Sequence, residues 1–461
     1  MSDAEKTRKP NGMNRRDLFR RTATAAGAVA GAHLLRPFNI LGQQSPNEQL
    51  GTAVIGAWGR GRGHLGAAAG ERLIAVVDVD EGRLGKAAEQ VSEKAPDVKK
   101  YTDYRKMFDE VGGDLDAVFV ATPDHTHAHA AMMAIERGMG VYVEKPMTRS
   151  IYESRALTEA VQQYGVASQL GNQGHSGEGY RRLCEYIWAG AIGDVTEIHC
   201  WTDRHFGGSG GRPESKPVPE GLHWDQWIGP RPYREYHTGL HSFNWRSWWD
   251  FGAGSLGDMG CHVADGAFWA LKIREADSYS VTLLSKNGGS EEMYPVDNLV
   301  RWDIPARAGM PAAKVFWHDG VGKEDRPDPI ARVEKEYERN LGGSGTLYFG
   351  TEGIMYTGCY GGGVRIIPEE QHRQTTPPEE KIPRVRGGHQ GDFLRSCKGG
   401  ERASSHFGYS GPLTEWILTG LLATRAGLNN TVEWDVKNTK CLNHPELNNY
   451  VKPEFRKGWE I

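Results

Sequence analysis

The chain has few cysteines for its length, no excess of charge and no long apolar run. Its six cysteines form no C-x-x-C pair and no Cys/His finger spacing, which argues against a zinc domain and predicts free, mostly buried thiols. A net charge of −4 provides no basic field for nucleic acid. The apolar segment 22–35 has 14 residues, fewer than the roughly 20 that a membrane-spanning helix needs.

Glycine and tryptophan, in contrast, are abundant, with 60 and 14 residues in a chain of 461. This length allows two domains or three. We predict a signal and linker at 1–49, a nucleotide-binding domain at 50–168 and a substrate-binding domain at 169–461.

The N-terminal segment contains the paired arginines Arg15 and Arg16, followed by the Ala/Gly-rich run 22–35. This order resembles a twin-arginine export signal, and small residues within the run offer cleavage sites. We therefore expect a periplasmic protein that is exported folded, with its cofactor already bound. The alternative is a helical N-terminal arm on a cytosolic protein.

Residues 50–80 have the pattern of a dinucleotide-binding unit. An apolar strand at 52–55 leads into a glycine-rich turn at 56–63 and then a helix, and a second apolar strand at 73–77 ends at Asp78. A helix N-terminus attracts pyrophosphate, and an acid at the next strand end accepts hydrogen bonds from ribose hydroxyls. The candidate cofactor-binding residues here are Gly56, Trp58, Gly59, Arg60, Gly61 and Asp78.

Two details of this unit bear on the cofactor. Trp58 occupies the position of the middle glycine of G-x-G-x-x-G, so its φ should be negative and its ring should point away from the pyrophosphate. Asp78 is followed by Val79, with no arginine there to hold a 2′-phosphate, which favours NAD over NADP.

Two further strands, 116–123 and 140–143, each end in polar residues that should gather at the same sheet edge. Further cofactor-binding candidates are Thr122, Pro123, His125, His127, Glu144 and Lys145. His125, His127 and His129 alternate at a helix start, where such residues are typically solvent-facing or line a cleft; we predict no metal site. Lys145, stiffened by Pro146, is placed to orient a substrate hydroxyl.

Together, the glycine turn, Asp78, the Thr122–His127 loop and Glu144-Lys145-Pro146 resemble the Gfo/Idh/MocA family of glucose–fructose oxidoreductase, inositol dehydrogenase and relatives. The resemblance runs from about residue 50 to the end of the chain. It implies an α/β protein: an N-terminal Rossmann domain plus a C-terminal α/β domain with a large open-faced, mostly antiparallel sheet. Exposed sheet faces in the family often pair, so we expect a homo-oligomer, a dimer or tetramer.

The same resemblance implies the catalytic residues. The family has an Asp-x-x-x-His motif in its second domain, which matches Asp258 and His262 here, on one face of a helix. In the family these positions converge with the lysine near the nicotinamide. We therefore expect Lys145, Asp258 and His262 to be catalytic and to contact substrate, with neutral His262 as the base.

Residues 223–251 are crowded with Trp, Tyr, Phe, His and Arg, a composition that suits stacking on sugars, although at least half of these rings should fill core. We expect the loop 204–211 to form a possible lid and Trp188 to lie in the core. Further substrate-binding candidates are Asn172, His175, Asn244, Trp245 and Arg246. Strands are predicted at Thr196–Asp203, Ser278–Leu284, Asn298–Asp303, Ala313–His318, Gly345–Phe349, Gly353–Thr357 and Thr431–Asp435, with a surface excursion at 319–340 and a loop at 367–386.

These features predict an exported NAD-dependent oxidoreductase that transfers hydride between a sugar or glycoside carbinol and a tightly held nicotinamide. One alternative is an NAD-dependent glycosidase that uses transient oxidation, elimination, water addition and re-reduction. An alternative of another class is a non-catalytic sugar or nucleotide sensor. The sequence identifies neither the sugar nor the acceptor.

Overall fold

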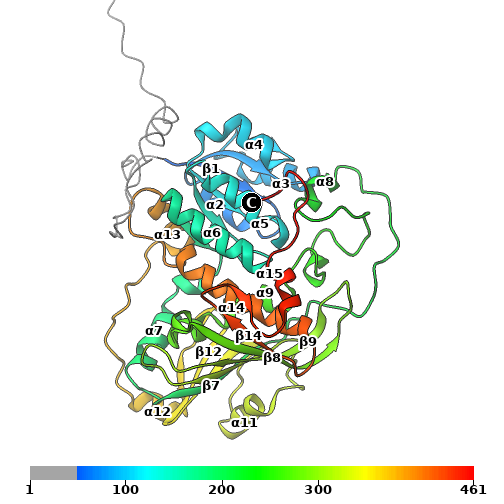
Figure 1. The fold of residues 1–461 in the computed structure, drawn as a ribbon. Coiled ribbons are helices and arrows are strands. Elements are labelled where there is room, and N and C mark those ends of the chain that lie inside the picture. The colour runs from blue at the N-terminus through cyan, green and yellow to red at the C-terminus, as the bar shows by residue number, and fades with distance from the viewer. Residues whose placement is uncertain (1–48) are drawn as a thin grey trace, which may run out of the picture. The chain divides into compact units, whose positions relative to one another are not determined.

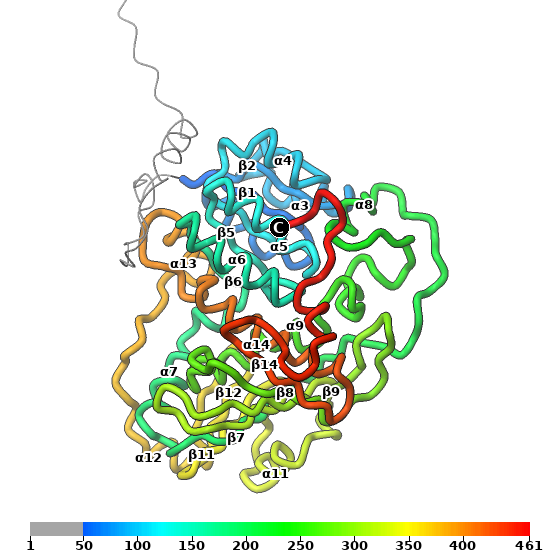
Figure 2. Tube along the Cα trace, viewed as in Figure 1, coloured from blue at the N-terminus to red at the C-terminus, as the bar shows by residue number. Residues whose placement is uncertain are grey.

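The computed structural model describes residues 49–461, and Figures 1 and 2 show the arrangement of this part of the chain. The predicted twin-arginine signal and nearly all of the predicted linker lie outside the described residues. Within residues 49–461, none of the helices is both long enough and apolar enough to cross a membrane. The six cysteines are free, and four of them are buried.

The first domain is built on a six-stranded parallel sheet in the order β3-β2-β1-β4-β5-β6. Its strands are β1 (Gly51–Ile55), β2 (Arg72–Val77), β3 (Lys99–Tyr101), β4 (Ala117–Val120), β5 (Gly140–Val143) and β6 (Ser168–Leu170). Its helices are α2 (Arg62–Ala68), α3 (Glu81–Val91), α4 (Tyr104–Val111), α5 (Asp124–Ile135) and α6 (Ile151–Tyr164). This strand order is that of a Rossmann fold.

Local sequence explains these elements. All residues of β1, β4 and β5 are buried, as expected for central strands with helices on both faces. Helix α6 begins with a capping box, in which the Ser150 side chain accepts a hydrogen bond from the Glu153 N–H and the Glu153 carboxylate accepts one from the Ser150 N–H. It ends at Gly165, whose φ is +65°.

The second domain is built on a nine-stranded sheet in the order β13-β12-β11-β7-β10-β9-β8-β14-β15. Its strands are β7 (Val195–Thr202), β8 (Ser278–Gly288), β9 (Pro295–Ile304), β10 (Ala313–His318), β11 (Ser344–Gly350), β12 (Gly353–Gly358), β13 (Arg365–Ile367), β14 (Thr431–Asp435) and β15 (Lys440–Cys441). The pair β7–β10 is parallel and the others are antiparallel. The predicted fold class is therefore confirmed.

The helices of the second part are mostly short. They are α7 (Glu178–Trp188), α8 (Trp224–Ile228), α9 (Gly254–Val263), α10 (Asp265–Ala270), α11 (Asp328–Glu336), α12 (Glu369–Gln374), α13 (Gly388–Cys397), α14 (Phe407–Ala426) and α15 (Asn448–Val451). Helices α11 and α12 lie in segments predicted as an excursion and a loop. The prediction that Trp188 lies in the core is wrong: its side chain is 39% exposed, and its indole N–H donates to the Ala270 carbonyl.

Helix α14 joins the two sheets. It packs against α6 of the first domain and against α9 and β8 of the second, and Figure 1 shows it between the two sheets. Arg155 on α6 forms two ion-pair contacts with Glu415 on α14, one of them Nη2–Oε1 at 2.8 Å, and also donates to the Val436 carbonyl. Glu415 is buried, so this pair fixes the helix junction.

The residues that follow α15 return to the first domain, as the tube in Figure 2 shows. The ring of Trp459 packs against His129 and Tyr104, with centroid distances of 4.9 and 6.2 Å, and the Arg105 guanidinium lies 4.2 Å from it. Trp459 is buried. The second domain is therefore connected to helices α4 and α5 through the end of the chain as well as through α14.

Segment 222–251 forms its own buried cluster beside the first domain. The cluster contains Leu222, Trp224, Trp227, Ile228, Tyr236, Leu240, Trp245, Trp248 and Phe251. Two backbone hydrogen bonds attach it to the residues that connect β2 with α3, from the His223 N–H to the Val79 carbonyl and from the Glu81 N–H to the Gly221 carbonyl. The expectation that many of these rings fill core is confirmed.

We predict that Arg155→Ala lowers the free energy of unfolding by about 2–3 kcal/mol, because the buried Glu415 carboxylate loses its cation. Urea denaturation followed by tryptophan fluorescence measures the loss. Lys216→Ala is the control, since Lys216 pairs with Glu214 at the exposed surface and its removal should cost under about 1 kcal/mol. Equal effects of the two substitutions would contradict the proposed role of the α6–α14 pair.

Candidate active site

A cavity of about 400 Å³ lies at the carboxyl ends of strands β1, β2, β4 and β5, and the second domain closes its other side. From the first domain it is lined by Gly56, Trp58, Gly59, Arg60, Asp78, Arg83, Thr122, Pro123, Asp124, Thr126, His127, Glu144 and Lys145, among others. The second domain adds Gln173, Arg204, Gln226, Trp227, His241, Ser242, Phe243, Trp245, Arg246, Asp258, His262 and Tyr360. Ligands of open α/β sheets bind at this edge.

The glycine turn has the geometry that a close approach of backbone segments requires. Gly56 has a φ of +74°, and a Cβ there would lie 2.7 Å from the Ala121 backbone. A Cβ at Gly61 would lie 1.9 Å from the Gly56 carbonyl oxygen, so only glycine lets helix α2 start this close to β1. Gly59 has a φ of +62° with open space beside it, which leaves room for a ligand along the turn.

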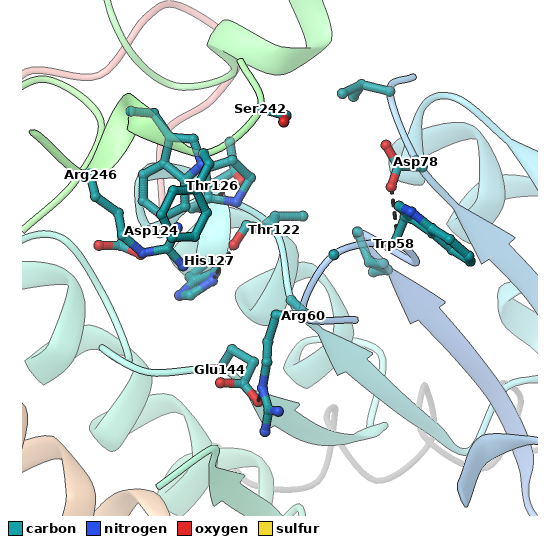
Figure 3. Close-up of a pocket in the computed structure, with 18 of the residues that line it drawn as sticks. Trp58, Arg60, Asp78, Thr122, Asp124, Thr126, His127, Glu144, Ser242 and Arg246 are labelled. Carbon is teal, nitrogen blue, oxygen red and sulfur yellow. Dashed lines mark hydrogen bonds and ion pairs between the residues drawn. The ribbon is translucent and has the colours of Figure 1, made fainter. Parts of the chain in front are cut away.

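Trp58 lies beside the acid of the next strand. Its backbone N–H donates to the Asp78 carboxylate at 3.2 Å, and the Arg62 guanidinium lies 5.2 Å from the centroid of its ring. The φ of Trp58 is not positive, as predicted from the sequence. Figure 3 shows Trp58 and Asp78 together on one side of the cavity, with Arg246, Asp124 and His127 on the other. Burial raises the pKa of Asp78 to about 6.

Glu144 ties the glycine turn to the Lys145 loop. This buried carboxylate accepts from Arg60 Nε at 2.7 Å, pairs with His64 Nε2 at 2.9 Å and accepts from Gln173 at 3.3 Å. Its pKa lies well below the usual range, because the nearby His64, Arg60 and Lys145 offset the desolvation of burial. Glu144 therefore positions its neighbours, and Figure 3 shows it beside Arg60.

Lys145 is held by the second domain. Its ammonium donates to Asp258 Oδ1 at 2.7 Å and to the Asp258 carbonyl at 3.1 Å. Arg246 Nε also donates to Oδ1, at 3.0 Å, and Arg204 Nη1 lies 3.3 Å from Oδ2. These cations hold the pKa of the buried Asp258 well below its usual range despite desolvation. Asp258 thus orients Lys145; its oxygens form no hydrogen bond with the ring of His262.

His262, on the next turn of α9, has an unused acceptor. Its Nδ1 is buried and has no hydrogen-bond partner in the described part of the chain. Burial and, second, the charge of Lys145 lower the pKa of His262 to about 3, so the imidazole is neutral across the physiological range. The ring of Tyr360 lies 4.6 Å from that of His262, and Tyr360 has a φ of +61°. A side chain in this strained backbone region next to a reactive group indicates a functional constraint.

The three alternating histidines are buried, and none is solvent-facing. His127 lines the cavity, and its Nδ1 and Nε2 lie 2.9 and 2.8 Å from the carbonyl oxygens of Pro146 and Thr122, to one of which the neutral ring donates. His125 does not line the cavity, because its ring lies between the carbonyls of Trp227 and Phe251 and ties α5 to segment 222–251. Within residues 49–461, no group of His, Cys, Asp or Glu is arranged to hold a metal ion.

The cavity brings together most, not all, of the predicted site residues. Gly61 does not line the cavity; it lets α2 start close to β1. Asn172 and His175 lie in a buried network around Asp265, with contacts of 3.1 and 3.0 Å, and not on the cavity wall. Asn244 is exposed and does not line the cavity, whereas its neighbours Trp245 and Arg246 do.

Several lining residues were not singled out as site residues from the sequence. Asp124 lay within the recognised loop between two predicted residues, and Arg204 lay in the predicted lid. Tyr360 sits in the stretch Gly358–Gly363, where four glycines around one aromatic residue were a usable signal. His241 gave no local signal; it reaches the site because it pairs with Asp80 beyond β2 at 3.1 Å.

The residues fit a nicotinamide dinucleotide. Gly59 offers open space along the turn, Asp78 offers a carboxylate at the end of β2, and Thr122 Oγ1 is buried without a hydrogen-bond partner among the described residues. Such an orphaned hydroxyl at the carboxyl end of β4 suits a polar group of the ligand. No arginine follows Asp78 directly, which matches a 2′-hydroxyl.

Comparison with known proteins agrees with this assignment. Residues 50–172 match the model of an oxidoreductase family, NAD-binding Rossmann fold, and residues 195–288 match the C-terminal alpha/beta domain of the same family.

Curated relatives match over part of their length. Inositol 2-dehydrogenase 1 of Saccharopolyspora erythraea is 34% identical over 152 residues, which cover 33% of this chain and 43% of that protein. The scyllo-inositol 2-dehydrogenase (NAD(+)) of Bacillus subtilis is 36% identical over 124 residues, 27% of this chain and 34% of that protein. The matched region thus spans less than half the length of these relatives.

Solved structures share the fold over most of the chain. The WlbA dehydrogenase from Bordetella pertussis, in complex with NADH and UDP-GlcNAcA, has a TM-score of 0.57 at 13% identity over 83% of this chain and 98% of that one. Levoglucosan dehydrogenase in complex with NADH has a TM-score of 0.52 at 18% identity, with the same coverage. With both domain models matched in order along its sequence, the chain belongs to the Gfo/Idh/MocA family of oxidoreductases.

Proposed function

We propose that the protein is an NAD-dependent oxidoreductase that interconverts a carbinol and a ketone on a sugar or polyol. One observation carries the proposal: Lys145, held by Asp258, and the neutral His262 line the same cavity as the glycine turn and Asp78. The inositol dehydrogenases among the relatives act on polyols of similar chemistry.

The proposed chemistry divides the work among three side chains. The glycine turn and Asp78 would hold NAD⁺, which would supply the acceptor for the hydride that leaves the carbinol carbon. Lys145 donates a hydrogen bond to the substrate oxygen and stabilises negative charge on it. The neutral ring of His262 accepts the hydroxyl proton. Asp258 keeps Lys145 in place, and Tyr360 restricts the ring of His262.

The wall opposite the glycine turn suits a sugar ring. Phe243, Trp245 and Tyr360 line the cavity, and aromatic faces stack on the C–H faces of sugars. Polar groups for the hydroxyls line the same cavity, including Gln173 and His241.

A second candidate is the NAD-dependent glycosidase, which needs a further acid or base for elimination and water addition. Asp124 supplies a specific observation in its favour, because it lines the same cavity and burial raises its pKa to about 7. Aryl glycosides separate the two candidates: release of the aryl alcohol without net NADH formation supports the glycosidase.

We also propose that the protein is exported through the twin-arginine route to the periplasm and acts there as a homo-oligomer. The paired arginines before the apolar run support export. Free NAD should be scarce outside the cytoplasm, so an exported enzyme would retain its cofactor and regenerate it within the catalytic cycle.

We predict that His262→Ala lowers kcat for sugar oxidation by about 10²–10⁴-fold, because the substitution removes the group assigned to take the hydroxyl proton, while NAD still binds. Stopped-flow fluorescence of NADH formation measures the rate, and titration of tryptophan fluorescence with NAD measures binding. Arg301→Gln, on β9 beside Asp303, is the control for a general loss of structure. Full activity of His262→Ala refutes this assignment, and sugar binding by the native protein without any turnover would support a sensor.

The raised pKa of Asp78 predicts a pH dependence of cofactor binding. Ionising this buried carboxyl is unfavourable in the free protein, so the charged form that accepts ribose hydroxyls dominates only above about pH 6. NAD should bind about tenfold more weakly at pH 5 than at pH 7. Isothermal titration of cofactor-stripped protein measures this change, and Asp78→Asn should bind weakly with no such slope. A wild-type affinity that is constant between pH 5 and 7 would contradict the role of Asp78.

Export with bound cofactor predicts that protein purified from the periplasmic fraction releases NAD on denaturation. Mass spectrometry of the released small molecules tests this. Replacing Arg15 and Arg16 by lysine is the matched control, and it should leave the protein in the cytoplasm. Empty periplasmic protein that binds NAD only loosely would count against cofactor retention.

A further inference from the structure

The end of the cavity nearest His262 carries more positive than negative charge. Lys145, Arg204 and Arg246 all line it, and all three ion-pair with one carboxylate, Asp258. In the described part of the chain, Arg204 and Arg246 have no ion pair with any other carboxylate. Three cations around one anion leave positive charge uncompensated.

The other carboxyl at this end does not remove the excess. Asp124 lines the cavity, and burial raises its pKa to about 7, so it is about half protonated at neutral pH. Glu144 is already engaged by Arg60 and His64. His262 is neutral and contributes no charge.

The two arginines also keep hydrogen-bonding capacity. Each donates a single N–H to Asp258, Arg246 from Nε and Arg204 from Nη1, whereas a guanidinium has five N–H donors. The planar fork of such a group matches a carboxylate in a bidentate geometry. An anionic group of the substrate can therefore bind without displacing either arginine from Asp258.

Neither arginine is a free surface side chain. The main chain of Arg204 is held by its N–H, which donates to Thr202 Oγ1 at 3.2 Å, and by its carbonyl, which accepts from the Gly320 N–H at 3.0 Å. Its side chain is 51% exposed, lines the cavity and is held by Asp258. The Arg246 guanidinium lies 4.2 Å from the Trp245 ring and 4.7 Å from that of Phe243. Both cations are positioned before substrate arrives, which lowers the entropic cost of binding.

We propose that the substrate is a sugar acid, whose carboxylate is bound by Arg204 and Arg246 while its carbinol meets Lys145 and His262. The proposal rests on the oxidoreductase function above and specifies the class of its substrate. A single negative charge fits the excess better than a phosphate dianion, because Asp258 already shares these cations.

The test compares matched substrates that differ at the group that bears the charge. Methyl glycosides of glucuronate and galacturonate are compared with the methyl esters of the same uronates and with methyl glucoside and galactoside, using the holoenzyme. Bound NADH formation gives the rate and tryptophan fluorescence gives Kd. A uronate should show a kcat/KM about 10–100-fold above that of its ester and of the neutral hexoside. Glucose 6-phosphate and galactose 6-phosphate form a separate arm.

Two substitutions of Arg204 test whether this residue causes the preference for uronates over their esters. Arg204→Gln should reduce the ratio of uronate to ester kcat/KM about tenfold, and Arg204→Lys should retain part of it. Arg301→Gln removes one positive charge outside the cavity and should leave the ratio unchanged.

The outcomes separate this inference from the general function. Oxidation of neutral sugars as efficiently as uronates overturns the sugar-acid proposal and leaves the oxidoreductase standing. Preferential binding of uronates without any oxidation supports the carboxylate site and refutes the oxidoreductase. Preference for the sugar phosphates, or failure of every uronate to bind, overturns the sugar-acid proposal.

Discussion

The buried ion pair between Lys145 and Asp258 is the contact on which the active site depends. Lys145 follows a strand of the first sheet, and Asp258 lies on a helix packed against the second, so their 2.7 Å contact sets the position of one domain's functional edge relative to the other. Desolvation makes such a pair costly in isolation. Here the cost is offset by Arg246 and Arg204, which share the same carboxylate. Removing any one of these groups alters the charge balance for the rest.

A second buried carboxylate organises the opposite end of the same loop. Glu144, one residue before Lys145, binds Arg60 from the glycine turn and His64 from α2. Neighbouring side chains of the motif Glu144-Lys145-Pro146 thus contact different parts of the protein: Glu144 contacts the nucleotide-binding turn and Lys145 contacts the second domain. This division explains how three consecutive residues connect the place of the cofactor with the place of the substrate.

Hydrophobic periodicity and sequence motifs, together with the family resemblance that the motifs carried, were sufficient to predict the fold and the site residues at strand ends. β10 and β14 begin and end where the sequence predicts, because apolar alternation marks buried strands directly. The failures have physical reasons. His125 is of a residue type that often binds ligands, but its two ring nitrogens face backbone carbonyls of a segment more than 100 residues away in sequence. Asn172 and His175 follow a strand end, but their side chains hydrogen-bond Asp265 in the interior and do not face the cavity. Partners so distant in sequence leave no local pattern.

The return of the chain end to the first domain has a mechanical consequence. Trp459 is wedged against α4 and α5, while α14 lies along α6, so the two sheets are bridged at separate places. A hinge opening between the domains would have to break both bridges together. Ligand entry and release therefore depend on the motion of individual loops. Their rates should respond to solvent viscosity and loop composition more than to changes that weaken the contacts between the domains.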